Sequence, residues 1–144
     1  MLYHDAIYDP TAASGRNEEL SAQLAEGELP DILAEHRVHK VARYVRATAS
    51  HAPAERDDDL NFFLDADLVI LGSDPDRYDQ YARDIRWEYA HVPDDQYREG
   101  RTRVLQSLAA RAGQSSLFKT TVLGTIYEEP AQQNIAREIQ LLAA

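Results

Sequence analysis

The chain of 144 residues contains no cysteine. This absence excludes a disulfide-stapled scaffold, a zinc site with cysteine ligands and an enzyme with a thiol nucleophile. Basic residues are also scarce, with 15 Lys and Arg against 25 Asp and Glu and a formal net charge of −10 at pH 7. Recognition of a nucleic-acid polymer through its phosphates needs a basic surface, so we do not expect this function.

Long hydrophobic runs are missing as well. The stretch Leu68–Leu71 is among the longest that no polar residue interrupts. A helix needs about 20 apolar residues to span a bilayer, so no membrane-spanning segment is expected. The start of the chain also lacks the basic and then apolar pattern of a secretory leader. We therefore expect a cytoplasmic protein that does not bind membranes.

The residues that are present predict a folded, all-α protein. Hydrophobic residues make up 44% of the chain and charged residues 28%, which is typical of a globular domain and not of a disordered chain. The length fits one domain with a core of its own. Helical periodicity and capping signals recur along the chain, whereas strand-like alternation does not. We expect a single-domain bundle over residues 1–144 with about seven helices.

Caps, glycines and prolines set the expected bounds of these helices. The helices cover approximately residues 1–8, 17–27, 30–48, 59–72, 74–90, 93–113 and 130–142. Residues 115–129 give the weakest pattern, and we expect a loop there with at most one short helix.

The expected helix over residues 59–72 carries a carboxylate where an apolar side chain belongs. Its apolar stripe recurs at i, i+3, i+4, i+8 and i+11 and consists of Leu60, Phe63, Leu64, Leu68 and Leu71. Position i+7 of this stripe is Asp67, whereas Asp65 lies about 200° away around the helix and points elsewhere. We therefore expect Asp67 to be buried, in a structural salt bridge, in a helix cap or as a metal ligand.

Arg101 is likewise a charged residue on an apolar stripe, in the expected helix over residues 93–113. It lies four residues after Tyr97, on the stripe that includes Val104, Leu105 and Leu108. A guanidinium on this face needs a carboxylate partner or meets a ligand phosphate.

Two histidines are also candidates for a site. His4 and Asp5 are adjacent, and their imidazole and carboxylate suit divalent metals such as Mn, Fe and Zn, although such a dipeptide often occurs by chance. His51 follows a helix, and it is either an exposed loop histidine or a further ligand or phosphate donor.

Several of these residues lie in segments that resemble a known family. Tyr3–Pro10, with the His-Asp pair, resembles the HD superfamily of metal-dependent phosphohydrolases. Phe63–Gly72 resembles the segment that supplies the last aspartate of that superfamily. The chain is more closely similar to a little-characterised bacterial group of predicted HD-type phosphohydrolases. The features shared with this group are Asn17–Ser21, the tyrosine-rich residues 78–89 and the Gly-Arg segment in 97–105.

The resemblance implies an HD-domain-like helical fold and a divalent metal ion (Mn, Fe, Mg or Zn) bound by His4, Asp5 and Asp67. It implies hydrolysis of a nucleotide or another small phosphate ester. Asp5 would position or deprotonate the attacking water, and His51 and Arg101 would bind phosphate oxygens. The first histidine of the superfamily precedes the His-Asp pair, but no histidine precedes His4. We therefore expect a domain truncated at its N-terminus relative to the family, with impaired activity.

Two other functions remain open. One is an HD-like protein without useful turnover that binds a ligand as a regulatory module. The other is a homo-oligomeric structural protein, because Trp87 lies opposite the inward stripe of its expected helix. An outward tryptophan is typical of a partner surface, such as that of a homodimer, although it could also cover a neighbouring helix of the same chain.

Overall fold

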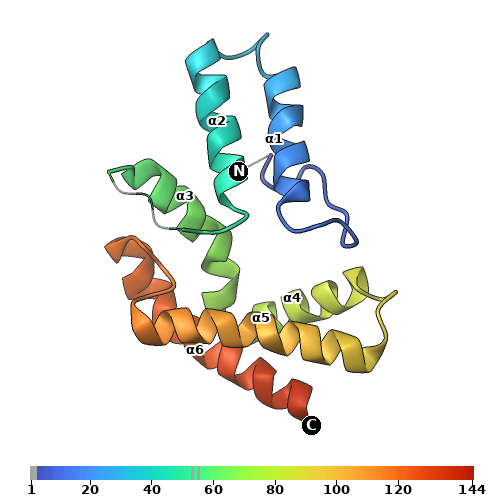
Figure 1. Cartoon of the computed structure of the whole chain (residues 1–144). Coiled ribbons are helices and arrows are strands. Elements are labelled where there is room, and N and C mark those ends of the chain that lie inside the picture. Colours follow the sequence, from blue (N-terminus) through green and yellow to red (C-terminus); the bar gives the residue numbers. More distant parts are fainter. Residues whose placement is uncertain (1–2, 53, 55) are drawn as a thin grey trace. The chain divides into compact units, whose positions relative to one another are not determined.

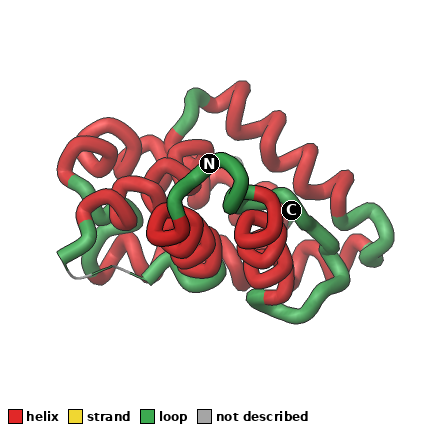
Figure 2. The backbone as a smooth tube through the Cα atoms, turned by 90° about the horizontal axis from the view of Figure 1, so that it is seen from above, coloured by secondary structure: helices red, strands yellow, loops and turns green. Residues whose placement is uncertain are grey.

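The computed structural model of the chain describes residues 3–52, 54 and 56–144, and this part of the chain contains helices and no strand. Figures 1 and 2 show the helices and the loops that join them. Six are α-helices and one is a short 3₁₀-helix: α1 (Arg16–Glu28), α2 (Glu35–Ala47), α3 (Asp58–Leu68), η1 (Val69–Gly72), α4 (Pro75–Glu88), α5 (Asp94–Gln114) and α6 (Thr121–Ala143). The predicted all-α class is therefore confirmed for the described residues.

The helix expected over residues 1–8 is not present in the described part of that segment. Met1 and Leu2 lie outside the described residues, and residues 3–8 form turns and bends. The reason is that side chains of α1 satisfy the backbone here. Ser21 Oγ accepts a hydrogen bond from the Ile7 amide at 2.9 Å and donates one to the Ile7 carbonyl at 3.2 Å. These bonds replace the helical ones that Ile7 would otherwise need.

The last helix begins nine residues earlier than its proline suggests. We expected Pro130 to start this helix, but α6 begins at Thr121 and continues through Pro130. The buried positions of α6 follow one continuous stripe: Leu123, Ala131, Asn134, Ile135 and Glu138. Burial of this stripe stabilises the helix on both sides of the proline. Proline leaves the carbonyl four residues earlier, on Ile126, without its helical donor. Because Ile126 is 56% exposed, water can supply that bond.

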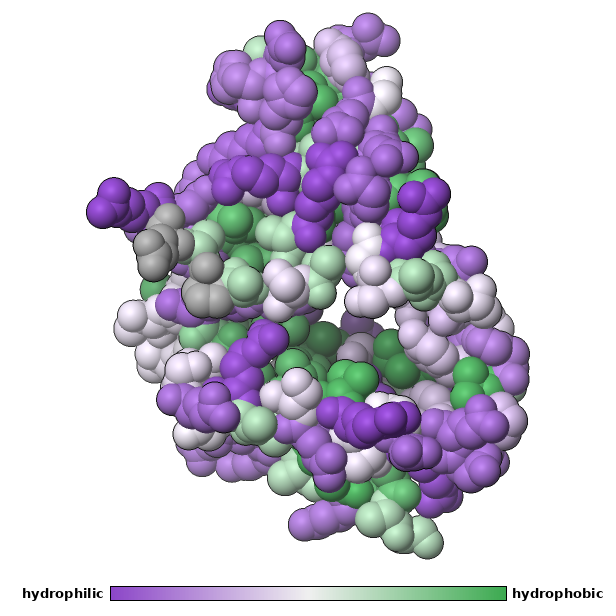
Figure 3. Space-filling view, viewed as in Figure 1, coloured by the Kyte–Doolittle hydropathy of each residue, from purple (hydrophilic) through white to green (hydrophobic). Residues whose placement is uncertain are grey.

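The chain forms two compact units, Met1–Leu64 and Asp65–Ala144, each with its own core. In the first unit α1 packs against α2 through small and branched residues: Ala22, Ala25, Leu29, Val38, Ala42 and Val45. Arg46 on α2 binds two carboxylates of α1, those of Glu19 and Glu26. At the start of α3, Leu60 and Leu64 pack against Tyr44. The visible surface of α1 and α2, at the top of Figure 3, is mainly hydrophilic.

The second unit consists of η1, α4, α5, α6 and the end of α3. Its core contains Leu71, Tyr78, Leu105, Leu117, Phe118, Leu123, Ala131 and Ile135. The short η1 packs directly against α6, and Asn134 of α6 donates hydrogen bonds to the carbonyls of Leu71 and Ser73 at 2.9 Å each. These bonds satisfy carbonyls at the end of η1 that have no helical partner. None of the helices described is both long and apolar enough to cross a membrane.

Candidate functional site

The His-Asp pair lies in the turns that precede α1. The Nε2 atom of His4 is 3.0 Å from a carboxylate oxygen of Asp5. The His4 side chain is 22% exposed and that of Asp5 is 68% exposed, so one is sheltered and the other faces water. Tyr3 next to the pair is held to α1, because its hydroxyl donates to Glu28 at 3.0 Å. The pair therefore presents a nitrogen and an oxygen ligand atom side by side on an anchored segment.

This geometry fits a divalent metal ion. Nitrogen and oxygen ligands lie about 2.1 Å from such ions, so two ligands at right angles lie about 3.0 Å apart. The 3.0 Å between His4 Nε2 and the Asp5 carboxylate matches that separation. Without an ion, the same distance is that of a hydrogen-bonded ion pair. The distance by itself is thus compatible with either state.

A cavity of about 310 Å³ lies beside His4 within the first unit. Its walls are mostly apolar and include the rings of Tyr3, Tyr44 and Phe63. A cavity of this size is at the lower end of the range for small-molecule sites.

His51 is not among the described residues that line this cavity. It follows α2 with a positive φ of 49°, and its backbone N–H donates to the carbonyl of Ala47 at 3.1 Å.

The burial of the two aspartates of α3 differs from the expectation. Asp65, which we expected to point away from the buried stripe, is fully buried, whereas Asp67 is only partly buried. The expected stripe assumed one α-helix as far as Leu71, but the chain tightens into the 3₁₀-helix η1 after Leu68. In a 3₁₀-helix residues i and i+3 share a face, so Leu71 stays in line with Leu68 and the change of helix type does not explain the difference. The cause is instead the set of donors that surround the Asp65 carboxylate. The expected burial of Asp67 was wrong, and its role as a metal ligand stays a prediction.

Asp65 is buried because the segment before α6 surrounds it with donors. Its carboxylate accepts hydrogen bonds from the Lys119 amide at 2.8 Å, the Thr120 amide at 2.7 Å and the Thr120 hydroxyl at 2.8 Å. Because α6 begins at Thr121, this carboxylate serves as its N-terminal cap and complements the positive end of the helix dipole. Burial lowers the pKa of Lys119, and the charge of Asp65, 3.6 Å from its Nζ, opposes this shift.

Arg101 has the carboxylate partner that its position on the helix demanded. Its Nε and Nη2 donate to the two carboxylate oxygens of Glu138, at 2.8 and 3.0 Å. The Tyr78 hydroxyl donates to the same carboxylate at 2.6 Å. Burial, and then the bond to Glu138, raises the pKa of Tyr78 far above its usual range, so the phenol stays protonated. Of the two interpretations of Arg101, the structure contains the ion pair, and phosphate binding stays a prediction.

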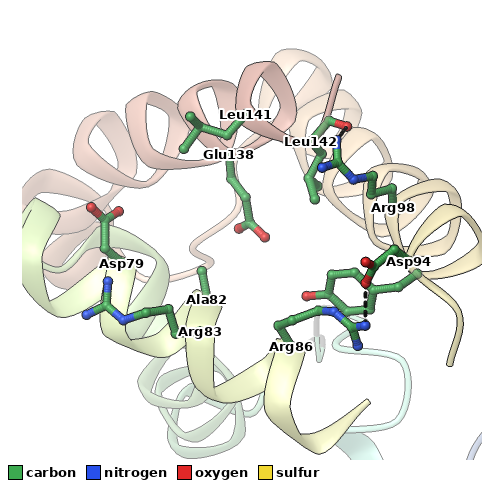
Figure 4. A pocket seen from close by; sticks show the side chains of 10 residues that line it. Asp79, Ala82, Arg83, Arg86, Asp94, Arg98, Glu138, Leu141 and Leu142 are labelled. Atoms are coloured by element: carbon green, nitrogen blue, oxygen red, sulfur yellow. Dashed lines mark hydrogen bonds and ion pairs between the residues drawn. The ribbon is translucent and has the colours of Figure 1, made fainter. Parts of the chain in front are cut away.

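A second cavity, of about 450 Å³, lies in the second unit and was not foreseen (Figure 4). Its walls come from α4, α5 and α6, and three of its side chains are arginines: Arg83, Arg86 and Arg98. The sequence carries a signal for it, because Asp79, Ala82, Arg83 and Arg86 recur at i, i+3, i+4 and i+7 and therefore share one face of α4.

Comparison with known proteins gives no relative for this chain: no family model, no curated protein and no solved structure matches it. The resemblance to the HD superfamily therefore depends on the sequence motifs alone.

Proposed function

We propose that the chain is a metal-dependent phosphohydrolase that acts on a nucleotide or another small phosphate ester. The observation that carries this proposal is the 3.0 Å separation of His4 Nε2 and the Asp5 carboxylate beside an organic-sized cavity. The resemblance of the motifs to the HD superfamily supports it. In the proposal His4, Asp5 and Asp67 bind one divalent ion, Mn, Fe, Mg or Zn. Asp67 is included because its segment resembles the one that supplies the last aspartate of the HD superfamily.

Each residue has a defined task in this proposal. A bound divalent ion would supply charge stabilisation for the phosphoryl group and a water of lowered pKa. Asp5 is 68% exposed, so one carboxylate oxygen can remain available to hold the attacking water and accept its proton. His51 is the proposed donor to a phosphate oxygen. The Arg101 guanidinium bonds to Glu138 through Nε and Nη2, so its Nη1 donors are the ones that would make the proposed contact with a phosphate oxygen.

The first test is metal retention. Purified chain is incubated with Mn²⁺, dialysed and analysed for metal, beside the variants Asp67→Asn and His4→Ala. About one ion per chain is expected in the wild type, because three ligands of this kind suffice to hold one ion. Both variants should lose it. The control is Asp59→Asn, an exposed carboxylate on the same helix α3 that pairs with Lys40. Its retention should equal that of the wild type.

The second test is turnover. Release of phosphate from nucleoside monophosphates is measured with and without Mn²⁺, and activity should require both the ion and His4. A wild type that retains no ion would overturn the proposal. The alternative of a binding module without turnover gains support from the pairing of Arg101 with Glu138, which engages donors of one proposed catalytic group. That alternative predicts that nucleotides raise the melting temperature while no phosphate is released.

A further inference from the structure

The cavity of the second unit is built from three helices that each turn one polar face inward. Asp79, Arg83 and Arg86 come from α4, Asp94 and Arg98 from α5, and Glu138 from α6. On α5, Asp94, Tyr97, Arg98 and Arg101 repeat the i, i+3, i+4, i+7 spacing found on α4. Figure 4 shows the labelled side chains around a common space, with the Glu138 carboxylate pointing into it. Arg83, Asp94 and Arg98 are exposed, so this charged lining is open to solvent and to a ligand.

The cavity lining contains as many arginines as carboxylates, although the chain as a whole is strongly acidic. Its three carboxylates each have an arginine partner: Asp79 pairs with Arg137 at 2.6 Å, Asp94 with Arg86, and Glu138 with Arg101. Two further guanidinium groups line the cavity, those of Arg83 and Arg98. The lining itself is balanced, with three arginines and three carboxylates, but Asp79 and Glu138 pair with Arg137 and Arg101, which lie outside the lining. Arg83 and Arg98 are therefore left without a carboxylate partner among the described residues.

The two additional arginines bind only neutral acceptors within the described part of the chain. Arg83 donates to the side-chain oxygen of Gln80 at 2.9 Å, and Arg98 donates to the backbone carbonyl of Leu142 at 3.1 Å. Each guanidinium has five N–H donors, so most of their donor capacity remains for a ligand. Guanidinium groups bind carboxylates and phosphates in a bidentate manner, and this pairing is stronger than a bond to a neutral acceptor.

The remaining wall is apolar. Ala82, Leu141 and Leu142 line the same space, and Leu141 is 63% exposed. A volume of about 450 Å³ is within the range of sites for small organic molecules. A lining that combines apolar side chains with a few convergent polar groups is typical of such sites. The ligand that matches it has an anionic group for the arginines and an apolar body for the leucines.

We propose that this cavity binds a small organic anion, whose carboxylate or phosphate group contacts Arg83 and whose apolar body packs on Leu141 and Leu142. All of its residues belong to the second unit, and none of them is a ligand in the proposed metal site. The inference therefore stands or fails independently of the proposed hydrolase activity.

The test uses the whole chain and four probes in calorimetric titrations: 1-naphthyl phosphate, 1-naphthoate, neutral 1-naphthol and inorganic phosphate. One or both naphthyl anions should bind about tenfold more tightly than naphthol, because each charge-assisted pair adds to the affinity. Inorganic phosphate alone should bind weakly, because it has no apolar body. The tighter of the two anions identifies the head group, phosphate ester or carboxylate.

Arg83→Gln is the diagnostic variant, because it removes a charge whose only hydrogen bond described is to Gln80. It should weaken binding of the preferred anion about tenfold and leave naphthol binding unchanged. The matched control is Arg103→Gln on α5, whose side chain is 70% exposed and pairs with Glu99. Leu141→Glu is a second variant, in which a carboxylate at the apolar wall should repel either anion. The inference is overturned if neither anion binds at millimolar concentration, or if Arg83→Gln and Arg103→Gln bind them equally.

Discussion

Arg101 and Glu138 lie 37 residues apart in the sequence, yet they meet through two parallel hydrogen bonds at 2.8 and 3.0 Å. Both side chains are less than one tenth exposed. The Tyr78 hydroxyl adds a third bond to the carboxylate, so helices α4, α5 and α6 are joined at one point. Such a cluster is sensitive to loss of either charged member, because the charge that remains is buried without a partner.

Glu138→Gln is therefore expected to lower the free energy of unfolding of the second unit by about 3–5 kcal/mol. The amide cannot compensate the Arg101 charge, and that charge stays buried. The double variant Arg101→Met with Glu138→Gln should recover part of this loss, because it leaves no buried charge. Urea unfolding followed by far-UV circular dichroism measures both. The control is Glu99→Gln, which breaks the exposed pair with Arg103 and should cost about 0–1 kcal/mol. Equal losses for Glu138→Gln and Glu99→Gln would contradict the expectation.

Substitution of Asp65 should lower stability more than substitution of Asp67, which is the proposed metal ligand. Asp65→Ala removes the acceptor of the Lys119 amide and of both Thr120 donors, and a buried donor without a partner costs about 1–3 kcal/mol. We expect a loss of at least about 3 kcal/mol in unfolding free energy. Asp67→Ala should cost less, because water reaches this partly buried position. A variant of Asp67 that unfolds more readily than that of Asp65 would refute this ranking.

Acid should weaken the link between α1 and α2. The hydrogen bond from Arg46 holds the pKa of Glu19 at about 2, below its ordinary value of 4.5. A lowered carboxyl pKa in the folded chain contributes stability above pH 4.5, and this contribution is lost as the pH falls from about 4.5 to about 2. The difference in urea midpoint between the wild type and Arg46→Gln should therefore shrink over that interval. Arg37→Gln, an exposed position on the same helix, is the control. A difference that stays constant from pH 7 to pH 2 would exclude this linkage.

Gly72 should not tolerate a larger residue. A Cβ atom at this position would lie 2.5 Å from the Tyr127 carbonyl oxygen and 2.8 Å from the Tyr127 Cβ atom. Gly72→Ala must therefore push η1 away from α6, at an expected cost of about 1–3 kcal/mol. Gly100→Ala in α5 is the matched control, since a Cβ atom there meets nothing within 4 Å. It should raise stability by about 0.5–1 kcal/mol through helix propensity, as measured by thermal unfolding.

Local signals predicted the helices well where a cap and a stripe agree. The helix expected over residues 74–90 is found as α4, and Asp74 accepts a hydrogen bond from the Arg77 amide at 3.1 Å as its N-terminal cap. The other α-helices were found, although α2 begins at Glu35 and not near residue 30, and distant side chains decide the backbone at two further places. Ser21 determines the conformation of Ile7, and the stripe of α6 overrides the stop signal of Pro130. No window of neighbouring residues contains that information.

The site could be predicted only in part, for the same reason. The position of Arg101 on its stripe required a partner, but only the packing of α5 on α6 identifies Glu138. Asp65 and Asp67 are two residues apart, and their burial was interchanged because the partners of Asp65 lie more than fifty residues later. The cavity of the second unit was missed because its charges pair across three helices, although each helix shows the spacing by itself.

The outward position of Trp87 was predicted from its place on α4 and is confirmed, with 80% of its surface exposed. It is the only tryptophan of the chain, so all indole fluorescence comes from a ring that already lies in water. Emission should therefore shift little when the chain unfolds, and a soluble quencher should reach the ring freely in the native state. Indole fluorescence therefore reports little about unfolding, but it responds to any molecule that covers the Trp87 face of α4. Protection from the quencher at high protein concentration would be the optical signature of a second copy on that face.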